Sequence, residues 1–182
     1  MTSAADFPFF PGVRSLHSPG PSHVPKAVQD AMTNQPMDMG DPRVDGFIAA
    51  CERGLRGLLN TKSADIFMYA ANGHGAWEAM TINLIAPGKK VLIAGTGHFS
   101  DSWAVLSEAV GAHVIRTPYN EGFPIDPEAI ESALRADTKN EIVAVFAVHT
   151  DTASSTTTDI PALRRAIDAT GHPALFVVDV VA

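Results

Sequence analysis

From residue 65 onward, two kinds of hydrophobic pattern alternate along the chain. Short runs in which nearly every residue is apolar predict strands, and longer stretches with apolar residues every three or four positions predict helices. The strands are predicted at 66–71, 91–95, 113–117, 142–148 and 174–179. The helices are predicted at 75–86, 99–110, 127–135 and 159–169. Such alternation is typical of an α/β fold.

Strands 142–148 and 174–178 are apolar at consecutive positions, so both of their faces are expected to be buried. Strands of this kind belong to a mostly parallel sheet with helices on both faces. Asp126-Pro127 and Asp159 near Pro161 are capping signals that start two of the crossover helices. The predicted fold class is therefore α/β, a three-layer arrangement around a mostly parallel sheet.

Residues 1–25 are predicted to form an extended N-terminal arm, because prolines and glycines are too dense there for regular structure. The remainder, 26–182, is expected to form one domain. Asp41-Pro42 predicts the start of a helix with one buried face. The apolar positions of that face are Val44, Phe47, Ile48, Cys51, Leu55, Leu58 and Leu59.

Charge and cysteine content limit the classes of function. A net charge of −7 with few basic clusters argues against a nucleic-acid partner, which needs a basic face. Cys51 is the only cysteine, so an internal disulfide is excluded, and we expect it in the core of a protein from a reducing compartment. No apolar run is long enough to span a bilayer, and the N-terminus does not read as a signal peptide. A cytoplasmic protein is the default expectation.

The segment 66–86 reads as a buried strand, a sharp turn and a helix. In the turn, Gly73 and Gly75 flank His74, so the backbone can approach a ligand closely. The helix that follows directs free N–H groups and its positive dipole end at the same place, which suits a phosphate. A tight connection without a ligand remains the alternative.

Further polar or aromatic residues follow other strands, and ligands bind at the carboxyl ends of strands in a parallel sheet. Phe99 could be a ligand platform or ordinary core packing. His149 could pair with Asp151, and Thr152 could cap a turn. Asp179 ends an apolar strand, where a carboxylate is costly unless it meets donors or a positive charge.

A metal site at His74 is not expected, because no second histidine or cysteine stands near it at ligand spacing. A phosphate cradle, an aromatic ring, a hydroxyl and a buried acid at successive strand ends together describe a site for a flat, phosphorylated, nitrogen-containing ring.

Six segments, in order, resemble class V (fold type I) pyridoxal-phosphate aminotransferases, particularly the alanine–glyoxylate and serine–glyoxylate or serine–pyruvate group. They are Ser18-Pro-Gly-Pro-Ser-His-Val-Pro25, Asn72-Gly-His-Gly-Ala-Trp-Glu-Ala79, Ala86-Pro-Gly-Lys-Lys-Val-Leu92, Gly97-His-Phe99, Val148-His-Thr-Asp-Thr152 and Val177-Val-Asp-Val-Val-Ala182. Nearly the whole chain is covered. The resemblance implies the large cofactor domain of that fold, which would be incomplete within 26–182.

The resemblance also implies roles for six residues, all of them cofactor-binding. Asn72, Gly73 and His74 would hold the phosphate of pyridoxal 5'-phosphate. Phe99 would stack on the pyridine ring, where the family often has tryptophan. Thr152 would bind the ring hydroxyl, and Asp179 would pair with the ring nitrogen, keeping it protonated. After Thr152 the chain departs from the family's usual Asn-Glu-Thr-Ser-Thr-Gly.

The resemblance assigns no catalytic residue to this chain, because the Schiff-base lysine of the family lies beyond Asp179. The lysines present, none at a matching position, are Lys26, Lys62, Lys89, Lys90 and Lys139. The expected whole protein is a homodimer that transfers an amino group from serine or alanine to glyoxylate or pyruvate. This chain would be an inactive N-terminal portion. A lyase or desulfurase of the same fold, and a truncated protein that only binds or dimerises, are the alternatives.

Overall fold

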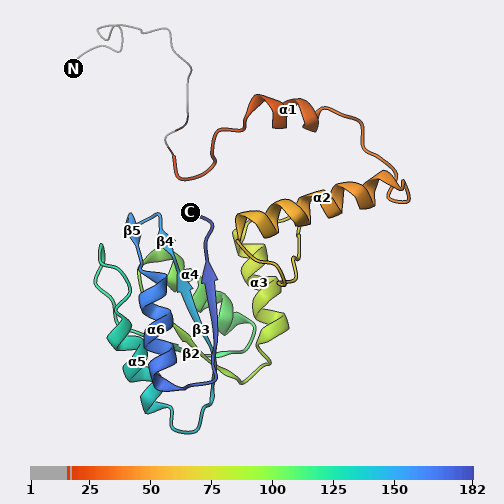
Figure 1. Ribbon diagram of the computed structural model, residues 1–182. Coiled ribbons are helices and arrows are strands. Elements are labelled where there is room, and N and C mark those ends of the chain that lie inside the picture. Colours follow the sequence, from red (N-terminus) through yellow and green to blue (C-terminus); the bar gives the residue numbers. More distant parts are fainter. Residues whose placement is uncertain (1–15, 17) are drawn as a thin grey trace, which may run out of the picture. The chain divides into compact units, whose positions relative to one another are not determined.

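The computed structural model describes residue 16 and residues 18–182, in two compact units (Figure 1). The first unit ends at Phe67 and the second is Met68–Ala182. The predicted N-terminal arm falls mainly outside the described residues, and at 18–25 the chain has no helix or strand. The second unit contains all the predicted site residues.

A four-stranded parallel sheet forms the centre of the second unit, in the order β2-β1-β3-β6. Its strands are β1 (Lys90–Ile93), β2 (His113–Arg116), β3 (Ile142–Val148) and β6 (Leu175–Asp179). Four of the five predicted strands are therefore confirmed. The register pairs Val148 at the end of β3 with Asp179 at the end of β6, so the residues after both strands emerge at one edge.

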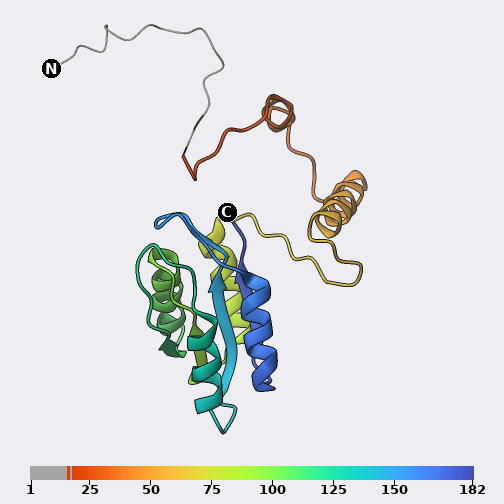
Figure 2. The same cartoon turned by 60° about the vertical axis from the view of Figure 1, so that its left-hand side comes forward.

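Helices cover both faces of this sheet, which confirms the predicted three layers (Figure 2). The helices are α3 (Gly73–Leu84), α4 (His98–Ala109), α5 (Pro127–Ala136) and α6 (Ile160–Thr170). On one face Val91 and Phe146 pack among residues of α3 and α4. On the other face Leu92 and Val145 pack against α5 and α6. Neighbouring strand residues thus serve opposite faces, as the alternation of side chains along a strand requires.

Two predicted helix starts are confirmed by their caps. The Asp126 carboxylate accepts from the backbone N–H of Glu128 at the start of α5. The Asp159 carboxylate accepts from the N–H of Ala162 at the start of α6. In both cases Pro lies at one of the first two helical positions, where its missing N–H costs nothing. Short antiparallel strands β4 (Thr150–Asp151) and β5 (Thr156–Thr157) form a hairpin that the hydrophobic pattern did not indicate.

The first unit contains α1 (Lys26–Met32) and α2 (Arg43–Leu58). The helix predicted after Asp41-Pro42 is present, but its expected buried face is wrong: α2 has no buried residue. Phe47 is 58% exposed, and Cys51 is exposed rather than in the core. The helical spacing makes an amphipathic helix, but nothing in the described part of the chain covers its apolar side.

The strand predicted at 66–71 is also wrong. These residues form no strand, and Phe67 and Tyr69 are 78% and 59% exposed. An apolar run becomes a strand only when a neighbour accepts and donates its backbone hydrogen bonds, and no strand in the described residues pairs with this run. The prediction that both faces of β6 are buried is likewise too strong, since Leu175 is 52% exposed. Among the described residues, no helix has the length and apolarity needed to cross a bilayer.

Candidate functional site

The turn before α3 presents free donors. The side-chain oxygen of Asn72 accepts from the N–H of Gly75 at 3.1 Å and so caps the helix. A Cβ at Gly75 would lie only 2.6 Å from that of Ala71, so this close approach requires glycine. Within the described chain, no group accepts from the N–H groups of Gly73 and His74. Because the positive end of the helix dipole lies here as well, the turn is suited to an anion.

The start of α4 has a similar geometry but is closed by the protein itself. The Asp151 Oδ2 accepts from the N–H of Phe99 at 3.0 Å. The hydroxyl of Ser100 accepts from the N–H groups of Thr96 and Gly97 at 3.0 and 3.2 Å. A carboxylate already occupies the place where an anion would bind. Of the two turns, only the one at α3 is open to a ligand.

Asp151 also fixes the hairpin that carries Thr152. It is fully buried, and its Oδ1 accepts from the N–H of Ala153 at 3.0 Å. Thr152 is half-buried in the hairpin turn. The His149–Asp151 pair that the sequence suggested as an alternative is not seen among the described residues, because the Asp151 carboxylate accepts from backbone N–H groups instead. The N–H of His149 donates to the carbonyl of Asp179 at 2.9 Å. This bond joins the residue just before the hairpin to the end of β6.

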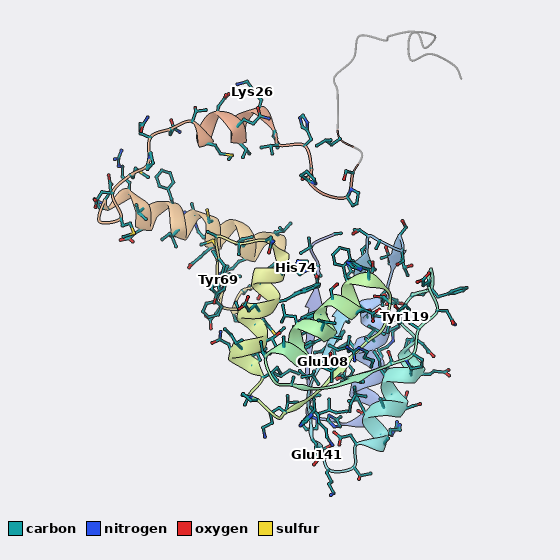
Figure 3. All side chains as sticks on the ribbon, turned by 180° about the vertical axis from the view of Figure 1, so that it is seen from behind. Lys26, Tyr69, His74, Glu108, Tyr119 and Glu141 are labelled. Atoms are coloured by element: carbon teal, nitrogen blue, oxygen red, sulfur yellow. The ribbon has the colours of Figure 1, made fainter. Side chains whose placement is uncertain are left out.

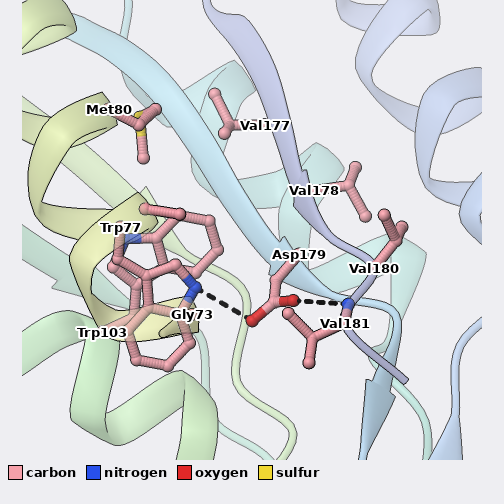
Figure 4. Close-up of a pocket in the computed structure, with 10 residues that line it drawn as sticks. Gly73, Trp77, Met80, Trp103, Val177, Val178, Asp179, Val180 and Val181 are labelled. Atoms are coloured by element: carbon pink, nitrogen blue, oxygen red, sulfur yellow. Dashed lines mark hydrogen bonds between the residues drawn. The ribbon is translucent and has the colours of Figure 1, made fainter. Parts of the chain in front are cut away.

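The carboxylate of Asp179 meets two donors, as its position after an apolar strand predicted. The indole Nε1 of Trp77 donates to Oδ2 at 2.9 Å, and the N–H of Val181 donates to Oδ1 at 2.9 Å (Figure 4). A carboxylate oxygen has two lone pairs, so each oxygen can still accept a further bond. Asp179 is therefore held in place without being saturated.

Trp77 connects three of the residues singled out in the sequence. Its ring centroid lies 4.7 Å from that of His74 and 6.3 Å from that of Phe99, edge to face with the latter. Together with its bond to Asp179, these contacts bring the start of α3, the start of α4 and the end of β6 to one place. A cavity of about 300 Å³ lies there, with Gly73, Trp77 and Asp179 in its lining. The other lining residues are Ala76, Met80, Trp103, Val177, Val178, Val180 and Val181.

The structure thus gathers Gly73, His74, Phe99 and Asp179 around Trp77, with Asn72 as the cap of the same turn. Thr152 is joined to this group only indirectly, through the backbone bonds of its hairpin. Sequence reasoning missed the parts played by Trp77 and Asp151. The only signals available for them were an indole one turn after the glycine turn and an acid two residues after a buried strand.

The comparison with protein families shows which family the chain belongs to. The sequence profile of class-V aminotransferases matches residues 15–182. The chain belongs to the class-V aminotransferase family. Members of this family depend on pyridoxal phosphate. Among the described residues, no three histidine, cysteine, aspartate or glutamate side chains lie close enough together to hold a metal ion.

Individual relatives agree with the family. The serine–glyoxylate aminotransferase of Methylorubrum extorquens is 38% identical over 169 residues, which are 93% of this chain and 42% of that protein. The L-aspartate–glyoxylate aminotransferase of Paracoccus denitrificans is 37% identical, over 88% of this chain and 41% of its own length. The structure of ureidoglycine–glyoxylate aminotransferase from Bacillus subtilis superposes with a TM-score of 0.83 at 26% identity, covering 94% of this chain and 43% of that one. This class-V chain therefore spans about two fifths of the length of these relatives.

Proposed function

We propose that this chain holds pyridoxal phosphate at the carboxyl edge of its sheet. One observation carries the proposal: the open turn at Gly73 and the carboxylate of Asp179 line the same cavity. A guest that suits both must carry an anionic group at one end and a hydrogen-bonding or cationic nitrogen at the other. Pyridoxal phosphate has these two features on a flat ring.

Each residue takes a role that its environment allows. The N–H groups of Gly73 and His74 bind the phosphate, with Asn72 keeping the turn in shape. Phe99 lies against the ring, and Thr152 binds the ring hydroxyl. Asp179 accepts from the protonated ring nitrogen with its remaining lone pairs. When bound, the cofactor supplies an electron sink for the carbanion that an amino acid forms on losing its α-proton.

The proposed reaction of the whole protein is transfer of an amino group from a small amino acid, serine or alanine, to a 2-oxo acid, glyoxylate or pyruvate. The names of the relatives, which pair serine or aspartate with glyoxylate, support this substrate class. Lys90 of the second unit takes no part in this proposal. Lys90 opens β1 at the amino end and pairs with Glu141, which lies at the opposite end of this unit from His74 (Figure 3). This chain is therefore assigned cofactor binding and not the covalent step.

The test is a titration of the 182-residue chain with pyridoxal phosphate, followed by absorbance and equilibrium dialysis. We expect Asp179→Asn to weaken binding by about tenfold or more, since a charge-assisted hydrogen bond contributes about 1.5–3 kcal/mol. Asp126→Asn is the matched control, because it removes the same charge but leaves a residue that still caps α5. Equal affinity in all three proteins, or no binding by the unaltered chain, would overturn the proposal.

The whole protein is further proposed to be a homodimer in a reducing compartment such as the cytoplasm. Exposed apolar residues on α2, including Phe47 and Ile48, supply a surface that a second copy would cover. Light scattering should give twice the monomer mass, and Phe47→Glu should lower it. Val105→Glu, at an exposed position on α4, should leave the mass unchanged. A monomer for the unaltered chain would contradict pairing through the α2 surface.

A further inference from the structure

We propose that Trp77 is a positioning residue that fixes the carboxylate of Asp179 toward the cofactor. The inference rests on the proposed function, because it names what holds the group that faces the ring nitrogen. Its starting point is the 2.9 Å bond from the indole Nε1 of Trp77 to Oδ2 of Asp179, which joins positions 102 residues apart (Figure 4).

The indole is itself held in one orientation by packing. Trp77 is 5% exposed and stacks on Trp103, with ring centroids 5.1 Å apart and planes within 3°. Trp103 in turn stacks on Phe146 of β3, at 4.6 Å. A ring packed in this way cannot turn its N–H elsewhere without disrupting the layer between helix and sheet. The direction of the donor is therefore set by the core.

This bond removes a freedom that Asp179 would otherwise have. With the N–H of Val181 on Oδ1 and Trp77 on Oδ2, each oxygen has one fixed donor. The carboxylate plane is fixed as a result, and the lone pairs left over have a defined direction. Without Trp77, only the exposed segment after β6 would hold the group, since Val181 is 79% exposed. A binding group held on one side only must be ordered when the ligand arrives, which weakens binding.

Trp103 provides a matched control within the same stack. It is 2% exposed, and its Nε1 is buried without a hydrogen-bond partner in the described residues. Trp77→Phe and Trp103→Phe remove the same atoms from two stacked, buried indoles. Both indoles line the cavity, but only Trp77→Phe removes a donor from Asp179, so a spectral shift seen in Trp77→Phe alone reports positioning rather than packing.

The experiment measures affinity for pyridoxal phosphate and the absorption spectrum of the bound form in the full 182-residue chain. We expect Trp77→Phe to weaken binding about threefold to tenfold and to shift the spectrum in the direction that Asp179→Asn does. Trp103 lines the same cavity, so Trp103→Phe is compared by its spectrum rather than by its affinity, and we expect that spectrum to stay in place. In the Asp179→Asn background, Trp77→Phe should add little, because residues that act through one another are not additive.

A second measurement does not depend on the folding of the Trp77 variant. In the ¹⁵N-labelled chain, the indole N–H signals of Trp77 and Trp103 are followed on replacing Asp179 by asparagine. We expect the Trp77 signal to move and exchange faster, and the Trp103 signal to stay. Trp77 does not position Asp179 if the two indole signals respond alike, or if Trp77→Phe leaves the spectrum of the bound form unchanged, as Trp103→Phe is expected to do. Failure of the unaltered chain to bind pyridoxal phosphate would instead overturn the proposed function and this inference with it.

Discussion

The carboxylate of Asp137 closes the turn between α5 and β3 and shows what one buried acid does for the fold. Its Oδ2 accepts from the N–H of Ile142 at 2.6 Å and lies 3.2 Å from Nε2 of His172. Its side chain is 10% exposed, and that of His172 is 3% exposed. Burial raises the pKa of Asp137, but hydrogen bonds from the backbone of Ile142 and Glu141 and the contact with His172 outweigh it. The pKa of this carboxyl is lowered as a result.

A lowered pKa makes stability depend on pH in a defined direction. The ionised carboxylate contributes its full stabilisation above its ordinary pKa of about 4, and loses it as the pH falls through the lower value in the folded state. Asp137→Asn should therefore reduce the free energy of unfolding by about 1–3 kcal/mol at pH 7, with the deficit shrinking toward pH 3. Urea unfolding at both pH values measures this.

The control for this prediction is Asp168→Asn, a carboxylate on α6 whose side chain is 64% exposed. An exposed ion pair contributes little, so this change should cost less than about 1 kcal/mol at either pH. A loss for Asp137→Asn that is the same at pH 3 and pH 7 would show that the charge of Asp137 is not what stabilises the turn.

Residue by residue, the sequence indicated which side chains follow strands but not which of them touch. Asp179 and Phe99 were identified because the ends of parallel strands share one edge. Trp77 and Asp151 were not, because their roles depend on partners 102 and 52 positions away. The periodicity of apolar residues carries no information about such contacts, because they form only when the helices pack against the sheet.

Among the elements, α4 depends on an acid from another part of the chain. Asp151 offers its two oxygens to two different backbone N–H groups, those of Phe99 and Ala153. Gly97 allows this approach, since a Cβ there would lie 2.9 Å from Oδ2 of Asp151. The start of α4 and the β4–β5 hairpin are thus joined through one buried carboxylate.

Asp151→Asn is predicted to destabilise the second unit by about 1–3 kcal/mol, because an amide has one acceptor oxygen for these two donors and leaves one of them unpaired in the interior. Thermal unfolding measures the loss. Asp159→Asn is the comparison, since Asp159 caps α6 through a single N–H, that of Ala162, and asparagine caps equally well. Equal stability of the two variants would contradict the bridging role of Asp151.

The elements themselves were largely predictable. Strong period-3.6 and all-apolar patterns gave four helices and four strands of the second unit, with ends within two residues of those observed. The strand prediction at 66–71 was wrong because no neighbouring strand in the described chain pairs with these apolar residues. The β4–β5 hairpin was missed because each of its strands is two residues long, too short to show any period.

For the whole molecule, the division into two units predicts a local response to the cofactor. A ligand that binds only the folded second unit stabilises it by about 2.7 kcal/mol at a concentration of one hundred times Kd. Hydrogen exchange should therefore slow in α3, α4 and β6 on addition of pyridoxal phosphate and stay unchanged in α1 and α2. Pyridoxal without the phosphate should protect far less, since the open turn at Gly73 would lose its anion. Protection spread evenly over both units would contradict this assignment.

The exposed thiol of Cys51 gives the protein a practical use. Since it is the only cysteine in the chain, a maleimide dye would attach at one position, on α2 of the first unit. Both tryptophans, Trp77 and Trp103, lie in the second unit and are stacked with ring centroids 5.1 Å apart, so they can serve as one compact energy donor. Energy transfer from this pair to the dye would therefore act as a molecular ruler between the units in solution, without any engineered label site.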